Sequence, residues 1–276
     1  MPHKVLVGIP TLNNPDLLKS CLDSIYSTHD MYKGRDIRVI ALDDGSTSEN
    51  LEKNKIICAA KSIDLLMHKN RYGVARSWNN LSIHVDSDIV ILLNDDVEVT
   101  HNWIDVIIYT LDNNPEIGVV GLNAYEGENS ANKYAVPTYV ESKIMLGGNL
   151  HPILSARGFA FGFRKTDYDS VGGFDNRYFY FFEEIDFNLL FIEKLKKRNC
   201  ILSHPIIRHI HGATCFKDIN YHSNVFSESK VKFEEKWNVK WEELRNLFNK
   251  DKIPVLEKPL NEWNSNFNIW EDRRKK

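Results

Sequence analysis

The chain alternates short apolar runs with segments whose apolar residues recur at helical spacing. The apolar runs cover residues 5–10, 37–42, 63–67, 89–93 and 117–122. The segments 15–25, 74–85 and 103–111 repeat apolar positions every three or four residues, which is the period of an amphipathic helix. Strands that alternate with helices in this way predict an α/β fold with a mostly parallel central sheet flanked by helices.

The pattern changes after residue 122. Residues 123–152 are polar and weakly periodic, which predicts long loops with short strands that shape an acceptor pocket. A strand is expected at 158–164, a helix at 183–197 and a strand at 200–210. Helices at 224–237 and 239–249 then form a C-terminal helical extension. We expect a principal domain over 1–215, with halves at 1–122 and 123–215, and a tail over 216–276 that packs on it.

Bulk composition narrows the class of protein. A net charge of -3 gives no reason to expect nucleic acid as a partner. Four scattered cysteines without a C-x-x-C pair indicate reduced thiols, and no apolar run has the length of a signal or membrane-spanning segment. We therefore expect a cytoplasmic protein. The aromatic and basic tail, with Trp263, Trp270 and residues 273–276, packs on the domain in this interpretation, with a homodimer or peripheral membrane contact as the alternatives.

The run Ile89–Leu93 leads directly into Asn94, Asp95 and Asp96, with Glu98 close behind. A continuous apolar run is typical of a central strand, and ligands of open α/β sheets bind beyond the carboxyl ends of such strands. Neighbouring carboxylates at that place repel one another unless a cation joins them. Oxygen ligands of this kind suit Mg²⁺ or Mn²⁺, which complete their coordination with phosphate and water oxygens.

A second pair of acids, Asp43 and Asp44, follows the strand at 37–42. One interpretation is a turn that caps the next helix through Ser46 or Ser48. The other is recognition of a nucleotide base or ribose by a carboxylate, with Gly45 allowing close approach of the backbone.

A third acidic group and two histidines lie in the second half. Glu183, Glu184 and Asp186 stand in the first turn of a predicted helix, where the helix dipole stabilises acids. The alternative is a general base whose pKa is raised by the preceding aromatic run. His209 and His211 face the same way at the end of a strand, so either histidine is a candidate metal ligand.

The order of these segments resembles the family 2 glycosyltransferases. The matching segments in chain order are Val7–Asn13, Asp43–Ser46, Asn70–Gly73 with Asn79, Asn94–Asp96, Gly172–Asp175 followed by Phe182–Asp186, and His209–Thr214. Each motif alone is weak, but six in the family's order over residues 4–215 are specific. The resemblance implies a GT-A, Rossmann-like fold, with a nucleotide-sugar half before residue 122 and an acceptor half after it.

The resemblance also implies roles for individual residues. Glu184, or else Asp186, is the expected catalytic base of an inverting transfer from a nucleotide diphosphate sugar to a hydroxyl of a glycan or other acceptor. Asp96 and His209 are the expected ligands of Mn²⁺ or Mg²⁺. The expected donor-binding residues are Pro10, Thr11, Asn13, Asp43, Asp44, Arg71, Gly73, Asn79, Asn94 and Asp95.

Two departures from the family pattern keep another interpretation open. Asn94 replaces the first acid of the D-x-D motif, and Glu183-Glu184 replaces the family's Glu-Asp pair. The missing acid favours a non-catalytic nucleotide-sugar or glycan-binding module with the same fold. Nucleotidyl transfer is the weaker enzyme alternative, because residues 10–14 supply no glycine-rich loop with a basic residue.

Overall fold

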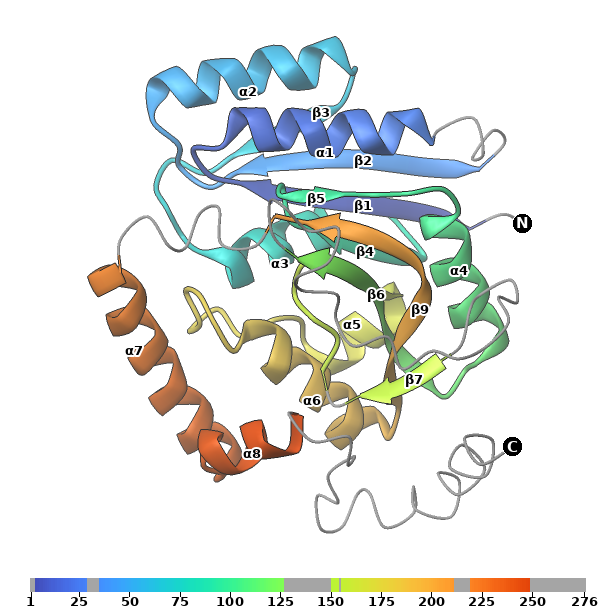
Figure 1. Cartoon of the computed structure of the whole chain (residues 1–276), viewed down its shortest axis with the longest axis vertical. Coiled ribbons are helices and arrows are strands. Elements are labelled where there is room, and N and C mark those ends of the chain that lie inside the picture. Colours follow the sequence, from blue (N-terminus) through green and yellow to red (C-terminus); the bar gives the residue numbers. More distant parts are fainter. Residues whose placement is uncertain (1–2, 29–34, 127–149, 154, 211–218, 249–276) are drawn as a thin grey trace.

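A computed structural model describes residues 3–28, 35–126, 150–153, 155–210 and 219–248 (Figure 1). Its centre is a nine-stranded sheet with the order β3-β2-β1-β4-β8-β6-β9-β5, and β7 pairs with β9. The strands are β1 Lys4–Thr11, β2 Asp36–Asp43, β3 Asp64–Met67, β4 Ile89–Leu93, β5 Val97–Glu98, β6 Ile117–Glu126, β7 Leu150–Ile153, β8 Ala160–Arg164 and β9 Arg198–His209. The helices are α1 Pro15–Ser27, α2 Ser48–Ala60, α3 Val74–His84, α4 Trp103–Asn113, α5 Lys165–Val171, α6 Glu183–Leu195, α7 Ile219–Trp237 and α8 Trp241–Phe248.

The sheet is mostly parallel, as the alternation of strands and helices predicts. Strand β1 pairs in parallel with β2 and β4, and β6 pairs in parallel with β9. Strand β8 is inserted between β4 and β6 and runs antiparallel to both. Strand β8 follows both β4 and β6 in the chain but lies between them in the sheet. Local periodicity does not specify such an insertion, which depends on contacts between distant segments.

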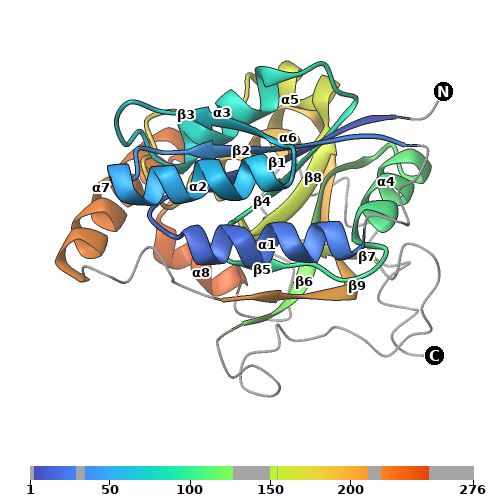
Figure 2. The same ribbon diagram turned by 90° about the horizontal axis from the view of Figure 1, so that it is seen from above.

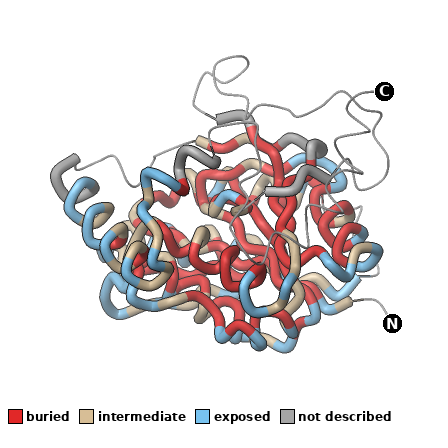
Figure 3. Tube along the Cα trace, turned by 90° about the horizontal axis from the view of Figure 1, so that it is seen from below, coloured by how far each residue is buried: buried red, intermediate tan, exposed pale blue. Residues whose placement is uncertain are grey.

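Two apolar cores lie on opposite faces of the sheet. Alternate residues of β1 divide between them, since Val5 and Val7 belong to one core and Leu6 to the other. Helices α1, α2 and α4 contribute to the first core, and α3, α5, α6, α7 and α8 to the second. Figure 2 shows α1 and α3 on opposite sides of the strands. The buried residues therefore concentrate in the central strands and the inner helix faces (Figure 3).

Three local features of the structure differ from the sequence prediction. Helix α5 is absent from the sequence prediction, because its seven residues are mostly polar and bury only Asp167, Tyr168 and Val171. Helix α2 is capped by Thr47, whose side chain accepts a hydrogen bond from Asn50 N, and not by Ser46 or Ser48. Helix α7 begins at Ile219, earlier than the predicted 224.

The C-terminal helices pack on the second core. Trp237 and Trp241 are half-buried against it, and Phe233 is fully buried. The predicted loop segment 123–152 begins within β6 and ends within β7, and its residues 127–149 lie outside the described residues. So does the tail at 249–276, with Trp263, Phe267 and Trp270. Within the part of the chain that the structure describes, no helix combines the length and apolar character needed to cross a membrane.

Candidate active site

Strand β4 is entirely buried and delivers Asp95 and Asp96 to the carboxyl end of the sheet. The Thr11 hydroxyl, at the end of neighbouring β1, donates a 2.7 Å hydrogen bond to Asp95 Oδ2. Burial, and then the adjacent charge of Asp96, raise the pKa of Asp95 to about 7. Thr11 and Asp95, both predicted to contact the donor, are thus held side by side at the end of two adjacent parallel strands.

Asp96 faces His209, and both side chains are buried. The short strand β5 pairs with β9 so that Val97 lies opposite His209, and Ile210 N donates to the Asp96 backbone oxygen at 2.9 Å. This pairing leaves His209 Nε2 3.4 Å from Asp96 Oδ1. Asp96 Oδ1 is a buried oxygen that accepts no hydrogen bond from any residue the structure describes. The two predicted metal ligands are therefore neighbours.

A buried carboxylate oxygen beside an imidazole nitrogen fits a divalent cation. Among the described residues, no group of three His, Cys, Asp or Glu side chains gathers that could hold a metal ion. His211, the alternative histidine, lies outside those residues. Without a further ligand from the described residues, a cation at Asp96 and His209 would complete its coordination with phosphate and water oxygens, which is the usual coordination of Mg²⁺ at substrate phosphates.

Asp43 stabilises the turn in which it lies. Its Oδ1 accepts hydrogen bonds from Gly45 N and Ser46 N, and its Oδ2 accepts from Asn54 Nδ2 in α2 at 2.7 Å. The structure thus shows the turn role that stood beside base recognition in the sequence analysis. Contact between Asp43 and a nucleotide base stays a prediction.

Asp44 holds a second loop against the first. Its carboxylate accepts from Tyr72 N at 2.9 Å and Gly73 N at 2.8 Å, and it lies 2.7 Å from His68 Nδ1. Gly73 has a φ of 88°, and a Cβ at this position would stand 2.3 Å from Phe179 O. Only glycine lets this loop pass so close to the segment that leads to α6.

Arg71 projects from the same loop onto two aromatic rings. Its guanidinium carbon lies 5.2 Å from the ring centres of both Phe179 and Tyr180. These cation–π contacts hold an exposed charge beside the start of α6. Its predicted contact with donor phosphates is untested.

Two asparagines predicted to bind the donor are engaged in holding loops. Asn13 Oδ1 accepts from Thr47 N and Asn50 Nδ2. Asn79 binds the backbone N–H and C=O of Phe174 and also the side chains of Tyr168 and Asn176. The structure therefore ties Asn79 to the 168–176 segment and does not aim its amide at Asp95.

Asn94 and Pro10 are placed by backbone pairing. Asn94 N donates to Phe159 O at 2.8 Å, which joins the end of β4 to the residue before β8. Pro10 lies opposite Leu42 in the register between β1 and β2. Both residues thus border the acidic edge of the sheet.

Helix α6 starts from an unusual turn. Phe181 and Phe182 both adopt the left-handed region, with φ values of 68° and 70°. Such backbone is strained for aromatic residues and is found where the surroundings enforce it, often at functional sites. It brings Glu183 and Glu184 into the first helical turn directly after Phe182.

Both glutamates have raised pKa values. Burial raises the pKa of Glu184, and burial together with the charge of Glu184 holds the pKa of Glu183 well above its usual range. Glu183 Oε2 is buried and accepts no hydrogen bond from the residues described. A glutamate with a raised pKa near a binding edge is suited to take up a proton from a reacting hydroxyl.

The dipeptide Gly158–Phe159 connects the glutamates with the metal candidates. A Cβ at Gly158 would stand 3.3 Å from both Cβ and Cγ of Glu184, so the glutamate side chain lies against this glycine. The ring of Phe159 stacks on His209, with centroids 4.5 Å apart. Glu184 and the Asp96–His209 pair therefore flank the same two residues, although they are distant in sequence.

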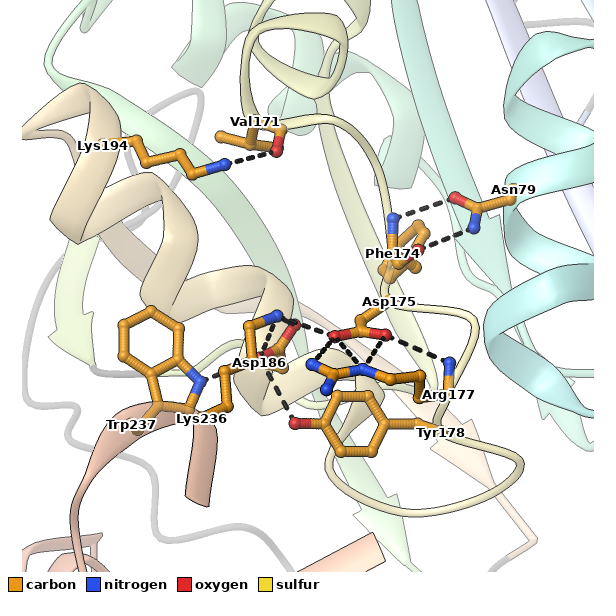
Figure 4. A network of polar contacts seen from close by, with 10 residues as sticks. All are labelled: Asn79, Val171, Phe174, Asp175, Arg177, Tyr178, Asp186, Lys194, Lys236 and Trp237. Atoms are coloured by element: carbon orange, nitrogen blue, oxygen red, sulfur yellow. Dashed lines mark hydrogen bonds and ion pairs between the residues drawn. The ribbon is translucent and has the colours of Figure 1, made fainter. Parts of the chain in front are cut away.

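Asp186 belongs to a different set of contacts. Its carboxylate accepts from Trp237 Nε1 at 2.8 Å and lies 2.8 Å from Lys236 Nζ (Figure 4). Burial raises the pKa of Asp186, and the Lys236 hydrogen bond opposes that rise. Asp186 is thus engaged with α7.

Sequence reasoning missed Asn188, which ties the backbone of Glu184 to the segment before β8. Asn188 Nδ2 donates to Glu184 O at 2.6 Å, and its Oδ1 accepts from Ala156 N at 2.9 Å. The side chain is fully buried. Its signal was available, since an amide one turn after Glu184 interrupts an otherwise apolar helix face.

The architecture and the site define the class of protein, and comparison supplies the family. A mannosyltransferase from Pyrobaculum calidifontis, solved with GDP-Man and Mn²⁺, is similar with a TM-score of 0.56 and 14% identity over 78% of this chain and 59% of that one. S. aureus TarS residues 1–349 are similar with a TM-score of 0.57 and 14% identity over 87% of this chain and 77% of that one. GalNAc-T7, solved with UDP, GalNAc and Mn²⁺, is similar with a TM-score of 0.63 and 13% identity over 95% of this chain and 55% of that one.

These likenesses show the GT-A fold, and this chain spans 59% of the mannosyltransferase and 55% of GalNAc-T7. The model of glycosyl transferase family 2 matches residues 6–184, and the chain belongs to that family. No curated protein matches the sequence.

Proposed function

We propose that this protein transfers a sugar from a nucleotide diphosphate donor to a hydroxyl of a glycan or other acceptor, with inversion at the anomeric carbon. The observation that carries the proposal is the placement of Glu184 and the Asp96–His209 pair on the two residues Gly158–Phe159. This arrangement offers a candidate base and a candidate cation site within one small region. Membership of glycosyl transferase family 2 supports the reaction class.

Glu184 is the proposed base. It accepts the proton of the acceptor hydroxyl as that oxygen bonds to the anomeric carbon, while the bond from that carbon to the donor phosphate breaks. Attack opposite the leaving group inverts the configuration in one displacement. Its half-buried position and raised pKa suit this role, whereas Asp186 is already paired with Lys236.

Asp96 and His209 would hold Mn²⁺ or Mg²⁺. A divalent ion bound there would stabilise the negative charge that develops on the leaving nucleotide diphosphate. The proposal draws support from the buried Asp96 Oδ1, which accepts no hydrogen bond from the residues described. The Mn²⁺ in the mannosyltransferase and GalNAc-T7 structures agrees with this choice.

The donor is proposed to lie across the carboxyl ends of β1, β2 and β4. In this proposal Thr11 and Asp43 contact the nucleotide base of the donor, with Asp44 beside them. Asp95 contacts the sugar or ribose of the donor, and Arg71 reaches its phosphates. The buried loop contacts of Asp43 and Asp44 then serve to fix the two carboxylates in place.

The test measures turnover of UDP-, GDP- and dTDP-sugars, with a CMP-sugar as the donor that lacks a diphosphate, by the purified protein with Mn²⁺, with and without an acceptor. Wild-type protein is expected to transfer or hydrolyse one donor. Glu184→Gln and Asp96→Asn should each lose most turnover, whereas Glu193→Gln, an exposed glutamate of the same helix, should not. Full turnover by both site variants would overturn the site assignment.

Asn94 favours one alternative, a nucleotide-sugar-binding module without catalysis, because it replaces an acid of the D-x-D motif. The same experiment separates the two functions. Binding of a nucleotide sugar with no turnover of any donor, with or without acceptor, would establish the binding module.

A further inference from the structure

Helix α7 supplies the partners of a buried carboxylate in the first turn of α6. Asp186 is fully buried, and Trp237 Nε1 and Lys236 Nζ each approach its carboxylate to 2.8 Å. Both partners lie more than fifty positions beyond residue 184, where the family match ends. A segment outside the matched domain therefore neutralises a charge on the helix that carries Glu184.

Lys236 also connects α6 with the turn before it. Its Nζ lies 3.0 Å from Asp175 Oδ2, and Asp175 is paired with Arg177 at 2.6 Å. Burial alone would raise the pKa of Asp175, but Arg177 and Lys236 hold it well below its ordinary value. One ammonium group thus bridges carboxylates at both ends of the segment 175–186 (Figure 4).

Aromatic packing from the C-terminal helices covers the strained turn itself. Phe182, with its left-handed backbone, packs against Phe226, Phe233 and Trp241 at centroid distances of 5.3, 5.0 and 4.8 Å. The Ser229 hydroxyl donates to Tyr180 O at 2.7 Å. Strained backbone of this kind persists only where its surroundings enforce it, and here α7 and α8 supply those surroundings.

We infer that Lys236 and Trp237 are positioning residues for the base: they fix the first turn of α6 and thereby the direction of Glu184. Glu184 is two residues from Asp186 on the same turn, and the turn begins at Phe182. This inference rests on the proposed function, because positioning of a base has a kinetic meaning only if Glu184 acts as one. Loss of the bridge should displace the base and leave the donor edge at β1, β2 and β4 unchanged.

The experiment compares Lys236→Met, Lys236→Arg and Trp237→Phe with Lys230→Met. Lys230 lies on the same helix but pairs with Glu234 and Glu242, so its variant controls for loss of a charge on α7. Lys236→Met should lower kcat by between about tenfold and a hundredfold, the scale expected for a misplaced catalytic group. The KM for the donor should stay within about twofold. Lys236→Arg should restore most of kcat, and Trp237→Phe should give a smaller loss.

A second measurement does not depend on turnover. The Asp186 amide donates to Phe182 O at 2.8 Å, so hydrogen exchange at this amide reports on the first turn of α6. Exchange should accelerate in Lys236→Met but not in Lys230→Met. Unchanged exchange together with unchanged kcat would overturn the inference. If wild-type protein turns over no donor, the proposed function fails, and unchanged exchange in Lys236→Met would separately refute the bridge.

Discussion

The Thr11 hydroxyl donates a 2.7 Å hydrogen bond to Asp95 Oδ2 in the buried space between the ends of β1 and β4. The two residues are 84 positions apart in sequence, and parallel pairing of the two strands brings them together. A short bond to a buried carboxylate is worth more than one between neutral groups, because an unsatisfied charge is costly to bury.

Replacement of Thr11 tests this contact. Thr11→Val keeps the side-chain shape and its preference for a strand but removes the donor, so it should lower the free energy of unfolding by about 1–3 kcal/mol. Thr11→Ser retains the hydroxyl and should lose less. Urea denaturation at neutral pH measures both, and equal stability of the two variants would show that the bond contributes little.

Metal binding at Asp96 should appear as ligand-dependent stabilisation. Mn²⁺ with the preferred nucleoside diphosphate should raise the Tm of wild-type protein, because a ligand that binds only the folded state stabilises it. Asp96→Asn should lose most of that increase. Glu98→Gln serves as the control, since Glu98 pairs with Arg208 at 2.9 Å, and it should retain the increase. Measuring the Tm with UDP, GDP, dTDP and CMP in turn would also identify the preferred nucleotide base of the donor.

Glu184 should set the acidic limb of the pH–rate profile. Burial raises its pKa above the ordinary glutamate value, and the proposed base acts only when deprotonated. The rate should therefore fall as pH decreases, beginning at a higher pH than for an exposed glutamate. The residual rate of Glu184→Gln should lack this limb, and a limb unchanged in that variant would assign it to another group.

The same raised pKa has a consequence for stability. A group whose pKa is higher in the folded state stabilises the fold at pH values below its unfolded pKa, and that contribution disappears as pH rises through the folded value. Glu184→Gln should therefore become more stable relative to wild type as pH increases. Denaturation series at several pH values measure the difference, and a constant difference would contradict a raised pKa.

Two glycines share a positive φ but differ in ψ, which is 19° at Gly172 and 173° at Gly73, and in what surrounds them. Gly172 has a φ of 91° and nothing within 4 Å of an added Cβ. Gly172→Ala should therefore lower the free energy of unfolding by only the cost of left-handed backbone, about 1 kcal/mol. Gly73→Ala places a Cβ 2.3 Å from Phe179 O and should lower the free energy of unfolding by more than about 3 kcal/mol. It should also weaken donor binding, because the 68–73 loop moves. Comparable losses in the two variants would refute the steric explanation.

The sequence by itself determined the α/β fold and the edge of the sheet at which the candidate site lies. Periodicity placed β1, β2 and β4 within one or two residues, because apolar runs this short, rich in β-branched residues and bounded by turn residues, favour buried strands over helices. Parallel strands end at a common edge, so Thr11, Asp43 and Asp95 had to converge. The polar helix α5 escaped detection because its seven residues repeat too few apolar positions to show a period.

Only the tertiary structure decided which acidic side chain has which partner. Asp44 is held by a loop 28 residues away, and Asp186 is paired with a helix 50 residues away. The antiparallel insertion of β8 places Gly158–Phe159 between Glu184 and His209. Hydrogen bonds and ring contacts depend on ångström-scale approach between distant segments, which the spacing of residues along the chain does not specify. The sequence thus located the acids, and long-range packing separated a candidate base from a carboxylate that holds the fold.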